Sequence, residues 1–365
     1  MRAAAEMRPA RRRGLTLTEL ILATGLASIV VLALLRLIDV SLSLWAKGEE
    51  QRSQVEEAGV VCALLARDLR AAVGGPRGDL VAEWAPFDAD GDGLLERHWP
   101  RLRLVRAASA AELARLARRD EGRSGAVVDV PRRGRIEVAW AVLPAARGEG
   151  PAAEGVLWRG ERVVRDDDAG SFFAPGFFDG SGRPPAGALD AVGGGCLWLG
   201  LSFATQTTTL REGWRIGPAL ADAAGSWDAW NRARPDARAH EWNTPGAGMP
   251  RVDDEALLPR RVRIELELER ADARERRTTL LAAMDALQGT LEVANGEALP
   301  KEAGAHVLVD AEWMEVLGVS GDVARVARGR RGTAPMPHEP GRTVHWGRRV
   351  VTEVPIPSHR DDWNL

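Results

Sequence analysis

The chain has 365 residues, and its apolar content of 45% is enough for a large buried core, which excludes an intrinsically disordered protein. The first 14 residues carry five arginines and one glutamate, a charge of +4, so the remainder carries −7 against −3 for the whole chain. This acidic remainder argues against nucleic acid as the main ligand. Cys62 and Cys196 are too few for a disulfide-dense scaffold, and whether they pair stays open.

The N-terminal segment has the pattern of a membrane span. Residues 1–13 are basic, and from Leu15 to Leu35 the chain is apolar except for Thr, Ser, Gly and one carboxylate, Glu19. As a helix, this run extends over roughly 30 Å, the thickness of the hydrocarbon core of a bilayer. The arginines before the run place its start in the cytoplasm and its end on the outer side of the membrane.

Two residues distinguish this segment from an ordinary signal peptide. Gly14 precedes the apolar run, where a signal peptidase would need a small-residue site after it. Glu19 lies within the run, and a carboxylate in lipid costs roughly 2.5 kcal/mol or more, so we expect it to have a partner.

The stretch Arg12-Arg13-Gly14-Leu15-Thr16-Leu17-Thr18-Glu19-Leu20 resembles the cleavage and methylation motif of type IV pilins and type II secretion pseudopilins. It departs from that motif at Leu15, where the family usually has Phe. The resemblance implies that a prepilin peptidase cuts after Gly14 and that Leu15 becomes a methylated N-terminus. It further implies that Glu19 pairs with the terminal amine of a neighbouring subunit, and that the head lies in the periplasm of a bacterium.

The helix is predicted to continue beyond the membrane. Apolar residues recur there at spacings of three and four, which predicts one buried helix face: Val55, Ala58, Val61, Cys62, Leu65, Leu69 and Ala72. Gly74-Gly75-Pro76 ends the pattern. A second, short helix is predicted over residues 110–119, because Ser109 and Glu112 have the spacing of a capping box.

Most of the remaining chain has the alternation of strands. The clearest examples are residues 135–143, 155–164, 196–204 and 261–269. In the last of these, Val262, Ile264, Leu266 and Leu268 alternate with charged residues that include Glu265, Glu267 and Glu269, which predicts a half-buried strand.

These elements predict an α+β, pilin-like fold: a long N-terminal transmembrane-plus-amphipathic helix packed on antiparallel β-sheet, with an extra small β module near the C-terminus. The expected segments are a cleaved leader (1–14), a transmembrane helix (15–38), a periplasmic head (39–287) with an amphipathic helix (39–73), the small module (288–347), and a final strand and tail (348–365). The module is either inserted into a hairpin whose first arm is 278–283 or appended to the head.

Two segments invite a binding interpretation. Residues 166–185 form a long predicted loop, and its four aromatics, Phe172, Phe173, Phe177 and Phe178, either form an exposed partner surface or fold back onto the core edge. In the small module, the stretch from Val326 to Thr333, with His338, Gly341 and Val344 beyond it, resembles a small β element of phage tails and other surface assemblies.

One segment has the spacing of metal ligands. Asp88, Asp90 and Asp92 stand at alternate positions before Gly93, as at the start of an EF-hand loop, and Glu96 is a further oxygen donor. Trp99 stands where an EF-hand has its bidentate Glu. A calcium loop of another kind and a plain acidic surface turn therefore both stay open.

The sequence favours an assembly subunit over an enzyme. The chain contains no H-E-x-x-H, C-x-x-C, G-x-S-x-G or phosphate-binding glycine motif, and we expect no cofactor apart from calcium. Several segments resemble the J-type minor pseudopilin of type II secretion, including residues 136–143, 156–159, 226–231 and 258–266. The expected partners are other pseudopilins or pilins, the prepilin peptidase and inner-membrane lipid. A minor pilin of a type IV pilus and a membrane-tethered envelope enzyme are the alternatives.

Overall fold

The structure, a computed structural model, describes most of the chain. The described residues are 16–75, 77–87, 97–124, 134–144, 155–164, 170–174, 176–178, 182–204, 227–230, 256, 258–269, 277–302 and 304–357.

The chain forms two compact units, Met1–Ser53 and Gln54–Leu365. Helix α1 (Leu17–Arg70) is continuous over 54 residues and runs from the first unit into the second. Its Leu17–Trp45 segment is long and apolar enough to cross a membrane. The large apolar side chains of this segment, among them Ile21, Leu32 and Trp45, are exposed, as expected for a surface that lipid would cover.

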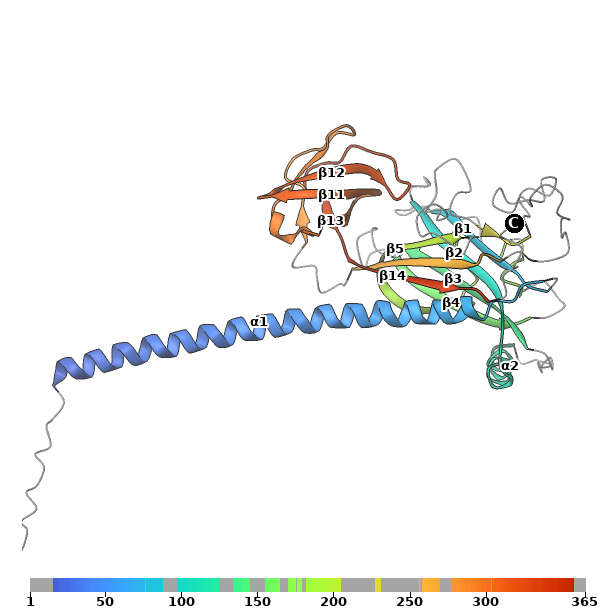
Figure 1. Cartoon of the computed structure of the whole chain (residues 1–365), viewed down its shortest axis with the longest axis horizontal. Helices are drawn as coiled ribbons and strands as arrows, with labels where there is room; N and C mark the ends of the chain where they lie inside the picture. The colour runs from blue at the N-terminus through green and yellow to red at the C-terminus, as the bar shows by residue number, and fades with distance from the viewer. Residues whose placement is uncertain are drawn as a thin grey trace, which may run out of the picture. The chain divides into compact units, whose positions relative to one another are not determined.

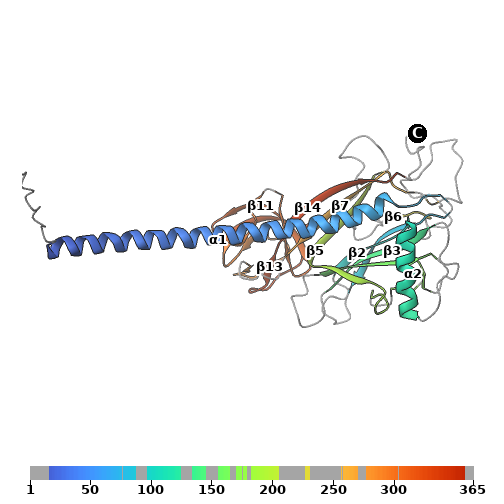
Figure 2. The same ribbon diagram turned by 90° about the horizontal axis from the view of Figure 1, so that it is seen from below.

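The second unit contains an eight-stranded antiparallel sheet, whose strands are visible in Figure 1. Its spatial order is β14-β7-β5-β4-β3-β2-β1-β6. The strands are β1 (Leu80–Phe87), β2 (Arg97–Ala107), β3 (Arg135–Pro144), β4 (Gly155–Val163), β5 (Asp190–Ala204), β6 (Trp227–Asp228), β7 (Arg261–Leu268) and β14 (Arg348–Pro355). Helix α2 (Ala110–Ser124) follows β2 and lies beside the sheet in Figure 2.

The second sheet has six strands in the order β8-β13-β10-β11-β12-β9. They are β8 (Thr278–Thr279), β9 (Thr290–Glu292), β10 (His306–Val309), β11 (Glu312–Ser320), β12 (Val323–Arg330) and β13 (Thr343–His345), with the short helix η3 (Gly296–Ala298) after β9. A bridge between Leu280 and Val293 joins the ends of β8 and β9, supported by the Leu281 N–H to Glu292 carbonyl bond of 2.9 Å. The sheet therefore closes on itself around its own core of side chains such as Val307, Met314 and Val344.

The small barrel is inserted into a hairpin of the larger sheet. Strands β7 and β14 pair in an unbroken antiparallel register from Arg261↔Pro355 to Leu268↔Arg348, and the six-stranded sheet lies between them in sequence. The first arm of this hairpin is β7, and residues 278–279 belong to the barrel. Because the barrel makes its backbone hydrogen bonds within itself, it can be inserted between β7 and β14 without breaking their pairing.

The larger sheet is covered on both faces. Apolar residues of α1, including Leu65 and Leu69, share one core with even-numbered strand residues such as Val138 and Trp140. On the opposite face, the N–H of Phe172 donates to Glu137, and Phe172 and Phe177 are buried. Of the two interpretations of this aromatic segment, the one in which it packs against the core is confirmed.

The predicted α+β, pilin-like fold is wrong. Strand residues (44%) outnumber helical ones (26%), and two large curled antiparallel sheets make up the head, which is not a small pilin fold. The prediction failed because periodicity identifies a strand without revealing its neighbours. It also missed β1 and β2, which contain Pro86 and Pro100, although Leu102 and Leu104 alternate there with Arg101 and Arg103.

Candidate functional site

The processing motif lies at the edge of the described chain. Gly14 and Leu15 fall outside the described residues, whereas Thr16 and Glu19 are described. The Thr16 N–H and hydroxyl both donate to Glu19 Oε2 at 2.9 Å, and the Glu19 N–H donates to the Thr16 hydroxyl at 3.3 Å. This is a capping box, which satisfies two helix-end donors and places a negative charge at the positive end of α1.

Glu19 therefore has a role within its own chain that our sequence analysis missed. The signal was present, because a Thr followed three residues later by Glu is the capping-box pattern. Both of its described contacts use Oε2, so Oε1 has no contact within the described part of the chain. The cap thus leaves one oxygen of the carboxylate available for a positive group on another molecule.

The second half of α1 buries the face predicted from its spacing. Ala58, Val61, Cys62, Leu65, Leu69 and Ala72 are all buried, together with Ala66. The same face carries one charged residue, Asp68, whose side chain is 0% exposed. A buried carboxylate needs close partners, and the cation that α1 itself offers, Arg67, is half exposed and lies 3.6 Å away.

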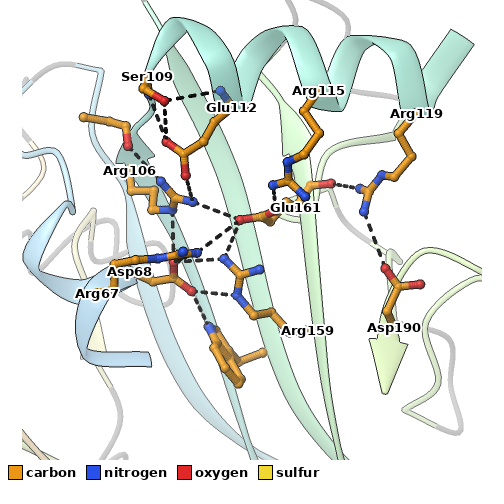
Figure 3. A network of polar contacts seen from close by, with 12 residues as sticks. Arg67, Asp68, Arg106, Ser109, Glu112, Arg115, Arg119, Arg159, Glu161 and Asp190 are labelled. Carbon is orange, nitrogen blue, oxygen red and sulfur yellow. Dashed lines mark hydrogen bonds and ion pairs between the residues drawn. The ribbon is translucent and has the colours of Figure 1, made fainter. Parts of the chain in front are cut away.

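Asp68 is neutralised by side chains from three strands of the sheet (Figure 3). Arg159 donates to it twice, at 2.8 and 2.9 Å, and the Trp140 indole donates at 3.0 Å. The Arg106 guanidinium lies 3.0 Å away. A single helix residue therefore joins α1 to β2, β3 and β4 through directional contacts.

A second carboxylate, Glu161, extends this network to helix α2. Arg106 and Arg115 donate to it at 2.9 and 2.8 Å, and Arg159 at 2.5 Å. Burial alone would raise the pKa of Glu161, but the hydrogen bonds and charges of these arginines outweigh burial and lower its pKa to about 2. Glu161 is thus ionised at all physiological pH values.

Helix α2 is placed by the same network. Its predicted capping box is confirmed: Ser109 N–H and hydroxyl donate to Glu112 at 3.0 and 3.1 Å. The Ser109 hydrogen bonds and Arg106 together lower the pKa of Glu112 to about 2, in spite of partial burial. Arg119 also donates to the Glu161 carbonyl and lies 3.4 Å from Asp190.

Substitution of Asp68 measures how much its ion pairs contribute to the packing of α1 on the sheet. We expect Asp68→Asn to lower the free energy of unfolding by about 3 kcal/mol, because the buried Arg106 and Arg159 would lose one of the two buried carboxylates, Asp68 and Glu161, that they share. Denaturant unfolding of the detergent-solubilised chain, followed by Trp fluorescence, measures the change.

Asp190→Asn is the matched control within the same network. Asp190 is 59% exposed and lies 3.4 Å from Arg119, so the loss of this exposed ion pair should cost under about 1 kcal/mol. Equal losses in the two variants would show that Asp68 does not anchor the helix.

The motif singled out in the barrel forms a loop around another buried carboxylate, Glu312. Arg328 donates to both of its oxygens at 2.6 Å, and the N–H groups of Gly329 and Met336 each donate at 3.0 Å. The donors outweigh burial and lower the pKa of Glu312 to about 2. The hydrogen bonds to Glu312 thus hold the loop from residue 328 to residue 338 in its conformation.

His338 closes this loop between two carboxylates. Its Nδ1 lies 2.7 Å from Asp310 Oδ2, and its Nε2 lies 3.0 Å from Glu312 Oε2. Both contacts are hydrogen bonds only when the imidazole carries two protons. Burial alone would lower the pKa of His338, but the bonds to Asp310 and Glu312 and their charges outweigh burial and raise its pKa above the ordinary 6.5.

His338 therefore predicts a pH-dependent contribution to stability. Since its folded pKa is raised, its stabilisation is complete below pH 6.5 and is lost as pH rises through the folded pKa. We expect His338→Gln to cost about 2 kcal/mol near pH 6 and less at pH 9. Paired denaturant titrations of wild type and variant at the two pH values measure this. A difference that does not change with pH would contradict a doubly protonated His338.

The barrel and the larger sheet meet at the charged face of β7. Glu265, Glu267 and Glu269 alternate along this strand and are all buried, so the predicted half-buried strand is buried on its charged face as well. Arg331 from the barrel lies 2.9 Å from Glu265 and 2.7 Å from Glu267. His345 Nδ1 lies 2.8 Å from Glu269.

Arg331 is also enclosed by aromatic rings. Its guanidinium carbon lies 4.2 Å from the ring centre of Trp313 and 4.9 Å from that of Trp198. Arg331 has a φ of 53°, which is uncommon for a residue other than glycine. Ion pairs and cation–π contacts offset that conformational cost. The chain returns through Gly347, where an added Cβ would lie 2.4 Å from the Leu268 carbonyl oxygen.

The predicted calcium ligands Asp88, Asp90, Asp92 and Glu96 lie outside the described residues. Among the residues that are described, no group of three His, Cys, Asp or Glu has the geometry of a metal site. Cys62 and Cys196 are both buried and do not form a disulfide. Burial raises the pKa of Cys62 to about 11, so it is not a reactive thiolate.

No protein-family model matches this chain, and a search of curated proteins finds no significant match.

Proposed function

We propose that this protein is a minor pseudopilin, a structural subunit at or near the tip of a type II secretion pseudopilus. A prepilin peptidase would cut it after Gly14, and α1 would hold it in the bacterial inner membrane. In this arrangement its N-terminus faces the cytoplasm and its head faces the periplasm. The chain would act through packing surfaces and would aid protein export without catalysing a reaction.

The observation that carries the proposal is the sequence order at the N-terminus. A run of arginines, Gly14 and then Glu19 directly precede an apolar helix segment, Leu17–Trp45, that is long enough to span a bilayer. This order resembles prepilin motifs and differs from a secretory signal, whose cleavage site follows its apolar run. The Thr16–Glu19 capping box supports a helix that begins directly after the proposed cleavage site.

The architecture of the head does not support this proposal. Its two sheets are not a small pilin fold, so the proposal rests on the N-terminal segment and takes nothing from the architecture of the head. What the head contributes is a helix that is continuous from the apolar segment to Asp68. A force applied to the membrane segment would therefore reach the sheet through the Asp68 ion pairs.

Processing tests the proposal first. In cells with an active prepilin peptidase, intact mass of the membrane-extracted chain should correspond to a start at Leu15 with one added methyl group. Gly14→Ala should leave the leader largely attached, because the motif that this sequence resembles has Gly directly before the scissile bond. Gly25→Ala is the control, since an added Cβ there contacts nothing within 4 Å. An uncut Met1 form of the wild type, or a cut after Leu35, would remove the basis of the proposal.

Glu19 tests assembly separately from processing. Glu19→Ala and Glu19→Gln should both be cut normally but fail to co-purify with other pseudopilins, because each lacks the charge that would pair with a neighbouring terminal amine. Glu19→Gln keeps a capping-box acceptor, so it separates loss of charge from loss of the cap. Normal co-purification of Glu19→Gln would show that the residue acts only as a helix cap.

A further inference from the structure

Strand β14 is an open edge of the larger sheet. Within the described part of the chain it pairs with β7 alone and stands at the end of the strand order. It runs for eight residues without a bulge, and its centre is the β-branched stretch Val350-Val351-Thr352. Val351 is 46% exposed. A long, regular edge of this kind is a template for another strand unless it is protected.

The pairing with β7 determines which backbone groups of β14 face outward. Ile356 donates its N–H to the Arg260 carbonyl at 2.9 Å, in continuation of the β7 register. Antiparallel neighbours alternate between bonded and non-bonded pairs, so the even-numbered residues of β14 face β7. Arg349, Val351 and Glu353 therefore direct their N–H and carbonyl groups away from the sheet. Pro355 also lies at an outward-facing position but has no N–H, so the stretch that can pair fully with another strand is Arg349–Glu353.

Arg349, Val351 and Glu353 are complementary to the same three residues of a second copy of the chain. If two copies of β14 run antiparallel with Val351 opposite Val351 of the second copy, Arg349 lies opposite Glu353 of that copy, and the reverse also holds. All three pairs then join outward-facing backbone groups. Moving the centre of symmetry by one residue either way loses both charge pairs, because Arg349 or Glu353 would then lie opposite Val351. Cross-strand pairs of opposite charge stabilise a sheet, whereas like charges destabilise it.

We propose that β14 is a homodimer interface, at which two copies of this chain join their eight-stranded sheets edge to edge about a two-fold axis at Val351. The interface is isologous, with the same residues contributed by each copy. Arg349 and Glu353 already pair with Glu265 and Arg263 within their own chain, at 2.7 and 2.8 Å, which holds both side chains on one face of the sheet. This inference is independent of the proposed function.

Cysteine crosslinking of the full-length protein in detergent tests the register directly. In a hydrogen-bonded antiparallel pair, opposite Cα atoms lie about 5.5 Å apart, so a short bifunctional thiol reagent can join two opposite cysteines although their Cβ atoms are farther apart than a relaxed disulfide prefers. With such a reagent, Val351→Cys should move most of the protein to a band of twice the monomer mass. Val192→Cys is the matched control, because Val192 is an exposed valine on β5 of the same sheet. Equal crosslinking of the two variants would overturn the proposal.

A proline substitution tests the backbone contacts without relying on chemistry at the side chain. Val351→Pro removes an outward-facing N–H, so it should abolish the dimer in native mass spectrometry while leaving the melting temperature of the monomer nearly unchanged. Val350→Pro removes a bond to β7 and should lower the melting temperature. A Val351→Pro chain that remains dimeric would overturn the proposal. If that variant fails to fold, the crosslinking result decides.

Discussion

Asp68 is a carboxylate held out of water whose nearest cations, Arg106 and Arg159, come from the sheet, and the head is organised around that charge. Its partners come from β2, β3 and β4, so these strands must lie in one register for Arg106, Trp140 and Arg159 to converge. Apolar packing of α1 would tolerate small rotations of the helix. The ion pairs of Asp68 are directional and do not tolerate such rotations, so they define the orientation of the helix on the sheet.

The barrel repeats this arrangement around Glu312. There too a buried carboxylate collects donors from a distant stretch of chain, here Arg328, Gly329, Met336 and His338. Replacing Arg328 would leave the Glu312 charge without its guanidinium partner, which costs far more than an intact pair contributes. Buried carboxylates therefore specify the course of loops that contain few large apolar side chains.

The junction between the two sheets uses a third group of buried carboxylates. The glutamates of β7 contact residues that the barrel supplies, and Trp198 and Trp313 exclude water from Arg331. The insertion is thus held by side chains as well as by its two connections. Because the chain returns from the barrel to pair with β7, β14 is the last strand of the larger sheet within the described part of the chain.

The sequence by itself determined the local features of this protein. The apolar run, the buried face of α1 and the cap of α2 depend on residues three or four apart, and periodicity and capping chemistry express such relations directly. The same holds for the prepilin-like motif on which the proposed function rests. Tertiary structure alone decided the two sheets, the partners of Asp68 and the burial of the β7 glutamates. Arg159 lies 91 residues from Asp68 and Arg331 lies 64 from Glu267, and no local pattern in an alternating strand shows whether its charged face meets water or another sheet.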